Sequence, residues 1–265
     1  MAGLRPRPAG TRHRAGSTVR NVAGDGRRHV VAFGGLPPPD VPGARRPFRD
    51  YLCGLTGRAA PRVGVLTTAV GDQPAAVAQA CAWFEGIRGE VGHLALFPMP
   101  SVADPEDFLL SRDLIFVGGG SVANMLAVWR VHQLDRILRA AWQAGVVLAG
   151  VSAGAICWFE GGTTDSFGPD LRPFNDGLGL LAGSYCPHYD SEPGRRPLFT
   201  SLITAGLLPP GIACDDGAGA HFVDDDLDAI VTGLPGAAGY LVRPDGDGGF
   251  THTTLAARPL PGAGS

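Results

Sequence analysis

Short runs of β-branched and apolar residues alternate with helix-length segments as far as residue 160. The segment 133–144 shows the helical pattern clearly, because its apolar residues recur every three or four positions and form one face. We expect helices at 44–55, 73–87, 121–129 and 133–144, and strands at 29–33, 62–67, 91–97, 113–117 and 146–149. This alternation predicts an α/β fold, with a doubly wound, mostly parallel sheet flanked by helices.

The pattern changes beyond Gly161, where glycine, proline and aspartate become frequent and the apolar runs become shorter. One more helix is predicted at 195–205. The short runs predict strands at 212–214, 220–223, 229–231 and 240–242, and we expect them to complete the same sheet.

Both ends of the chain differ in composition from its centre. Residues 1–28 are rich in arginine, glycine and proline, and they lack an apolar stretch that could form the core of a signal peptide. The last residues are rich in proline and glycine. We therefore expect a disordered arm at 1–28, a single α/β domain at 29–258 and a frayed tail at 259–265.

The composition excludes several classes of function. With 22 basic and 25 acidic residues the formal net charge is -3, so no positive field favours nucleic acid or an anionic membrane. Every basic residue is arginine, which excludes a Schiff-base lysine, a Ser-Lys dyad and a P-loop. The five cysteines include no CxxC pair, and no apolar run is long enough to cross a bilayer. We expect a cytoplasmic protein without a disulfide framework or a metal site.

The clearest chemical signal is a G-x-S-x-G sequence at 150–154, between an apolar run and a predicted helical turn. In this context Ser152 would sit on a strained turn beyond the strand, and the flanking glycines would allow the close backbone approach. The amide of Ala153 would then face developing negative charge at the start of the helix. We interpret Ser152 as a catalytic nucleophile; a structural tight turn is the alternative.

A second glycine cluster, 118–120, follows the predicted strand 113–117. It should lie at the carboxyl edge of the sheet, where doubly wound folds form their binding crevice. Its amides would supply the other half of an oxyanion hole, whereas the alternative is a tight turn into the helix near Ser121. The run is not G-x-G-x-x-G, which disfavours a dinucleotide site.

A serine nucleophile needs a base, and we choose His188, which follows a strand-like run. His221 and His252 remain alternatives. The other four histidines lie in the arm, in predicted strands or in a helix, where structural roles are more common: His13, His29, His93 and His132.

The residues alone do not identify the acid that would orient the base. Asp215 and Asp216 precede Gly217 at another strand end, and a solvated loop is the alternative for each. The competing carboxylates are Asp165, Asp190 and Glu192.

Together these residues resemble the peptidase E family of serine exopeptidases, which share a fold with class I glutamine amidotransferases. The resemblance covers about residues 29–243 and rests on the glycine cluster, the serine elbow with Trp158, and the segments 163–165, 187–189 and 215–217. It implies Ser152 as nucleophile, His188 as base and Asp216 as acid, with the amides of Gly119 and Ala153 as oxyanion donors. The chain departs from the family's common Glu at the acid position and from its Asn after the triple glycine.

The resemblance also implies a substrate. Family enzymes that cleave after an N-terminal aspartate use an arginine downstream of the histidine, and Arg195 and Arg196 are similarly placed. We expect these two residues and Asp165 to bind a short peptide, without metal or cofactor. A cyanophycinase-like peptidase or esterase with the same serine, and a non-catalytic amidotransferase-like binding protein, are the alternatives. The chain should be a monomer or a homodimer.

Overall fold

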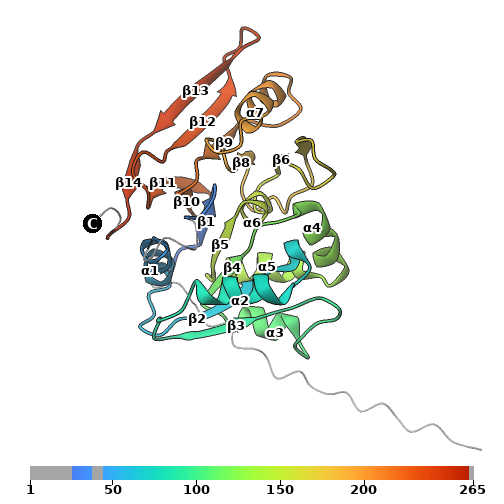
Figure 1. Ribbon diagram of the computed structural model, residues 1–265, viewed down its shortest axis with the longest axis vertical. Coiled ribbons are helices and arrows are strands. Elements are labelled where there is room, and N and C mark those ends of the chain that lie inside the picture. The colour runs from blue at the N-terminus through green and yellow to red at the C-terminus, as the bar shows by residue number, and fades with distance from the viewer. Residues whose placement is uncertain (1–25, 38–43, 263–265) are drawn as a thin grey trace, which may run out of the picture.

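The computed structural model describes residues 26–37 and 44–262 (Figure 1). The predicted arm lies outside the described residues up to residue 25. At its end, Arg28 donates a hydrogen bond to Asp224 (Nε to Oδ1, 3.3 Å), which ties the start of the described chain to the domain. Within the part of the chain that the structure describes, every helix is too short or too polar to pass through a bilayer.

The first sheet has eight strands in the order β14-β11-β10-β1-β5-β4-β2-β3. Its centre is parallel, and β10 and β11 join it in antiparallel fashion. The strands are β1 (His29–Phe33), β2 (Arg62–Leu66), β3 (Glu90–His93), β4 (Leu114–Val117), β5 (Val147–Val151), β10 (Ala218–Val223), β11 (Asp226–Thr232) and β14 (Ala257–Pro259). The predicted α/β fold is confirmed, and the five N-terminal strands lie close to the predicted runs, although β3 ends at His93 and not at residue 97.

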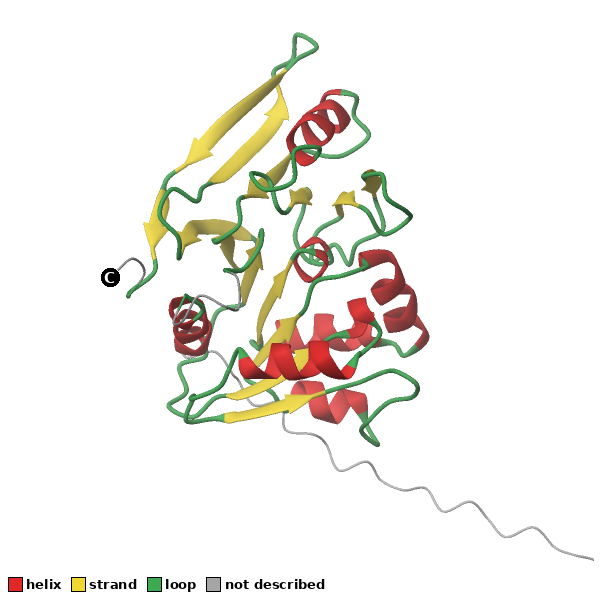
Figure 2. Ribbon diagram, in the orientation of Figure 1, coloured by secondary structure: helices red, strands yellow, loops and turns green. Residues whose placement is uncertain are grey.

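Helices cover both faces of this sheet (Figure 2). Its central strands are therefore buried on both sides, as β1 shows. In β1, Val30 and Ala32 pack with the helices of one face, whereas Val31 and Phe33 pack with those of the other. One face carries α4 (Val122–Val131), α5 (Leu134–Gln143) and α6 (Ala153–Ile156), with α3 (Pro105–Leu110) against α5; the other carries α1 (Arg46–Leu55) and α2 (Pro74–Ala82). The strand ends between these layers carry the loops of the site.

A second sheet of six strands corrects one prediction. Its order is β13-β12-β9-β8-β6-β7, and its strands are β6 (Gly161–Thr164), β7 (Arg172–Phe174), β8 (Ser184–Cys186), β9 (Gly211–Cys214), β12 (Gly239–Pro244) and β13 (Phe250–Leu255). The runs at 212–214 and 240–242 therefore belong to this sheet and do not complete the first one. The cause is the turn 215–217, where Gly217 has a φ of 81° and the chain crosses from β9 to β10 in the other sheet.

The C-terminal segment is more ordered than its composition predicts. Helix α7 (Arg195–Thr204), which was expected, packs on the second sheet beside the β12–β13 hairpin (Figure 1). Pro259, expected in a frayed tail, lies in β14 and pairs with β11. The next residue, Leu260, is buried and donates its N–H to Thr232 O at 2.7 Å. These contacts fix the chain as far as Leu260.

A buried histidine pair joins the first residue of β1 to β10, at the opposite end of β1 from Ser152. His29 Nδ1 lies 3.0 Å from His221 Nε2, and the Tyr51 hydroxyl lies 2.8 Å from His221 Nδ1. Burial, followed by the charge of His29, lowers the pKa of His221 to about 4, and the carboxylate of Asp228 offsets only part of this effect. The folded protein therefore holds His221 neutral where the unfolded chain binds a proton.

This pair predicts a loss of stability in mild acid. Above a pH of about 6.5 the His221 contribution is fully present, and it declines as the pH falls towards about 4, by about 3 kcal/mol in all. Urea unfolding at about pH 7 and about pH 5 measures it, with His221→Gln as the control, since glutamine does not titrate. An identical pH dependence in wild type and variant would contradict this assignment.

Candidate active site

Ser152 occupies a strained turn between β5 and α6. Its φ is 54° and its ψ is −116°, and its N–H donates to Phe33 O of the neighbouring strand β1 at 3.2 Å. A side chain on Gly150 would collide with the main chain of Gly154, and one on Gly154 with that of Val117. The glycines of the G-x-S-x-G sequence are thus required by close backbone approach, as predicted for a nucleophile elbow.

The loop after β4 brings Gly119 close to the serine. A Cβ built on Gly119 would lie 3.2 Å from Ser152 Cβ and 3.8 Å from its Oγ. Among the described residues, the N–H groups of Gly119 and Ala153 donate to no carbonyl or side chain, so both remain able to bind an oxyanion. The structure places Gly119 beside Ser152, and Ala153 follows Ser152 directly, so both residues predicted to supply the oxyanion amides lie at the serine.

The candidate base and acid form a direct pair. His188 Nδ1 lies 2.7 Å from Asp216 Oδ1, which leaves Nε2 of the ring to face a nucleophile. Both residues lie on turns of the second sheet, since His188 follows β8, with a φ of 51°, and Asp216 follows β9. Asp216 is therefore the carboxylate that contacts the predicted base.

The turn that carries Asp216 is held from two sides. The Asp216 N–H donates to Asp190 Oδ1 at 2.9 Å, and the side chain of Ser191 also bonds to Asp216. Burial by itself raises the pKa of the Asp216 carboxyl, but the hydrogen bond and charge of His188 and the bond from Ser191 outweigh it, so this pKa is lowered. Asp216 stays ionised at neutral pH, as an orienting carboxylate must.

Gly35 links this pair to the elbow. It follows β1, forms a bridge with Asp216 and accepts the Gly217 N–H at 3.0 Å. A Cβ on Gly35 would overlap the Asp216 carboxylate and lie 3.0 Å from His188 Nδ1. Because Val151 pairs with Phe33, the His188 ring and Ser152 lie at the same end of β1. Among the described residues the Ser152 hydroxyl makes no hydrogen bond to His188; catalytic hydrogen bonds of this kind often form only when substrate is bound.

The alternative bases and acids are engaged elsewhere. His221 contacts His29 and Tyr51, and the His252 ring stacks on Tyr240 at 4.7 Å. Asp215 accepts the Ala238 N–H at 3.0 Å and the Tyr240 hydroxyl at 3.1 Å, and burial raises its pKa. Glu192 pairs with Arg195. Asp215 and Asp216 are adjacent in sequence, but only Asp216 contacts His188.

The three predicted substrate contacts are not brought together. Arg195 is 2% exposed and its guanidinium donates to Glu192 at 2.7 Å and to Thr163, which gives it a structural role. Arg196 is exposed and lies over the ring of Tyr189, with Cζ 4.7 Å from its centroid. Asp165 is exposed on the loop after β6. The described residues include no cluster of side chains suited to a metal ion.

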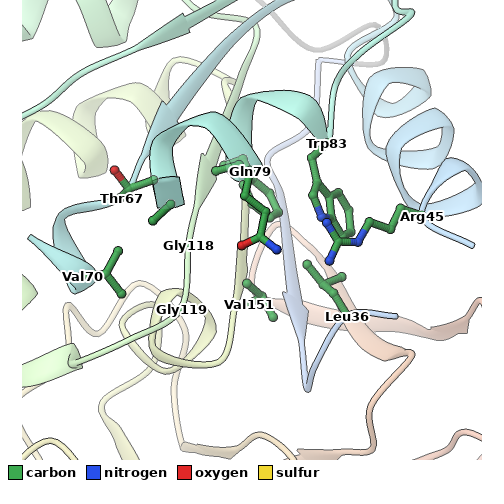
Figure 3. A pocket seen from close by; sticks show the side chains of 12 residues that line it. Leu36, Arg45, Thr67, Val70, Gln79, Trp83, Gly118, Gly119 and Val151 are labelled. Atoms are coloured by element: carbon green, nitrogen blue, oxygen red, sulfur yellow. The ribbon is translucent and has the colours of Figure 1, made fainter. Parts of the chain in front are cut away.

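The sequence did not point to a cavity of about 230 Å³ beside the elbow (Figure 3). It lies between α2 and the carboxyl ends of the parallel strands, and its lining includes Leu36, Gln79, Trp83, Gly119 and Val151. Figure 3 shows the Gln79, Leu36 and Val151 side chains pointing into the same space. The sequence signal for this cavity was the small face of α2, where Ala76 and Ala80 lie one turn apart.

Comparisons with known proteins identify the family of the chain. Residues 43–230 match peptidase family S51. An uncharacterized peptidase, YgaJ, from Bacillus subtilis (strain 168) is 45% identical over 238 residues, covering 88% of this chain and 97% of the relative. Peptidase E of Shewanella denitrificans (strain OS217) is 30% identical over 132 residues, which are 47% of this chain and 56% of that protein.

A solved structure shows the same fold. A peptidase from an acI-B1 actinobacterium superposes with a TM-score of 0.62 at 16% identity, covering 87% of this chain and 95% of the other. The family match spans the serine elbow, His188 and Asp216. The resemblance to the peptidase E family is thus confirmed, and the chain belongs to peptidase family S51.

Proposed function

We propose that the protein is a serine peptidase that works through an acyl-enzyme. The Ser152 hydroxyl attacks the peptide carbonyl while His188 Nε2 takes its proton, and the amides of Gly119 and Ala153 stabilise the oxyanion. His188 then gives the proton to the leaving amine, and water, activated by the same ring, releases the acyl group. Asp216 orients His188 and stabilises its protonated form.

The pair of His188 and Asp216 at the edge that carries the serine elbow is the observation that supports this proposal most directly. We propose short peptides as substrates, by analogy with the family. The aspartyl preference is not part of the proposal, because the arginine most firmly placed, Arg195, is committed to Glu192 and Thr163.

Two rival functions share these residues. A cyanophycinase-like peptidase or an esterase would use the same serine, so only a substrate panel separates them. A non-catalytic amidotransferase-like protein would leave Ser152 unreactive. Cys157 does not replace the serine, because burial raises its pKa well above the ordinary value and its thiol donates to Gly154 O at 3.2 Å.

Mass-spectrometric mapping of a fluorophosphonate adduct tests the proposal. We expect labelling at Ser152 in the native chain, and much slower labelling in the His188→Ala variant, because only a serine with a base reacts quickly. Ser201, exposed on α7, is the internal control and should remain unmodified. Absence of an adduct on Ser152 would favour the non-catalytic function.

A further inference from the structure

The cavity beside the elbow has a defined place relative to the proposed reaction. Gly118 and Gly119 border it on the oxyanion side, and Val151 directly precedes the nucleophile. Its described lining residues all lie within 36–151, in the first sheet, its helices and the loops that join them. His188 and Asp216 come from the second sheet.

The proton transfers indicate which part of a peptide would enter this cavity. His188 must reach the leaving nitrogen to protonate it, so the leaving group lies towards the second sheet. The carbonyl oxygen lies at the amides of Gly119 and Ala153. The third substituent of the carbonyl carbon carries the side chain of the acyl residue. With the other two directions taken, this side chain points towards the cavity.

The walls of the cavity favour an apolar side chain. The rings of Trp83 and Phe116 and the aliphatic side chains of Leu36, Val70 and Val151 form most of them. Two polar side chains at the walls are engaged within the protein. Thr67 Oγ1 donates to Asp72 at 2.8 Å, and Arg45 donates to Pro37 O at 3.0 Å with its guanidinium over Trp83. Gln79 adds a neutral amide (Figure 3).

We propose that this cavity is the acyl-side specificity pocket, and that it selects a large apolar residue such as Leu, Met or Phe at the position whose carbonyl Ser152 attacks. The assignment rests on the proposed function. Filling the cavity removes apolar surface of both partners from water, whereas an aspartyl side chain would lose hydration there.

A dipeptide panel tests the selectivity on the full native chain. The substrates share one leaving residue, as Leu-Leu, Met-Leu, Phe-Leu, Ala-Leu and Asp-Leu, and kcat/KM is measured for each. We expect the three large apolar substrates to exceed Ala-Leu by about 10- to 100-fold, the range by which hydrophobic pockets discriminate missing methylenes. A preference for Asp-Leu, or equal rates across the panel, would overturn the proposal.

Two variants on α2 locate the selectivity. Ala80 lines the cavity, whereas Ala78, on the same helix, is exposed and absent from the lining. Ala80→Phe is expected to fill the pocket and lower kcat/KM for Leu-Leu at least about 10-fold, with a much smaller change for Ala-Leu. Ala78→Phe should change neither. Equal loss on both substrates in Ala80→Phe, with folding intact by circular dichroism, would count against the pocket, and Ala76→Leu provides a milder filling variant.

Fluorophosphonate labelling distinguishes failure of the proposed serine mechanism from failure of the pocket assignment. If Ser152 is not labelled in the native chain, the proposed function fails. If Ser152 is labelled at similar rates in wild type and Ala80→Phe while the dipeptide preference is absent, the pocket assignment fails and the serine mechanism stands.

Discussion

Replacing Ser152 with alanine is expected to lower kcat for peptide hydrolysis by about four to six orders of magnitude. The variant keeps the oxyanion amides of Gly119 and Ala153, so only the rate that binding and these amides provide should remain. The fold should persist, since alanine meets no greater strain at a φ of 54° than serine does. Single-turnover and steady-state assays on a cleaved dipeptide measure the loss.

The control for this change is Ser201→Ala. Ser201 is exposed on α7 and its hydroxyl donates only to Leu198 O at 2.8 Å, so this variant should retain wild-type turnover. If Ser152→Ala kept more than about a hundredth of the wild-type kcat, the assignment of Ser152 as nucleophile would be wrong.

The Asp216→Asn change has the second largest expected effect. The amide of asparagine would donate to His188 Nδ1, forcing the ring proton onto Nε2, where it blocks acceptance of the serine proton. In a well-studied triad this tautomer change lowers kcat by about 10⁴-fold, and we expect a similar loss here. Because the side chain is isosteric, the free energy of unfolding should change little by comparison.

A rescue variant and a pH profile distinguish this role from a structural one. Asp216→Glu retains a carboxylate that can accept from His188 Nδ1, so it should recover much of the activity lost in Asp216→Asn. A structural role would instead make both variants lose stability together. Activity of Asp216→Asn should increase towards high pH, where hydroxide substitutes for the missing base, and a flat profile with wild-type turnover would exclude Asp216 from the triad.

Local patterns were enough to predict the elbow and the parallel half of the fold. The apolar run before 150–154 determines a buried strand, and close backbone contacts leave no alternative to glycine around Ser152. The apolar face of the segment 133–144 likewise predicted α5. These features depend on neighbours in sequence.

Features that depend on distant contacts were not predictable in the same way. Asp215 and Asp216 are adjacent and chemically identical, and only the turn decides that one faces Tyr240 while the other faces His188. The family resemblance selected Asp216, whereas the residues alone did not. The division into two sheets was missed because short strands such as β9 carry no signal for their pairing partners. The lining of the cavity was missed for the same reason.

The crossing of the chain between the two sheets has a consequence during synthesis. A ribosome that has translated as far as residue 187 has made the proposed nucleophile and both proposed oxyanion donors, but neither the proposed base nor its carboxylate. Asp216 arrives 28 residues after His188 and takes its place only when the turn beside Gly35 forms. In the proposed mechanism, a chain translated only as far as residue 187 therefore has no base for Ser152, and it can hydrolyse peptides only after synthesis and folding are complete.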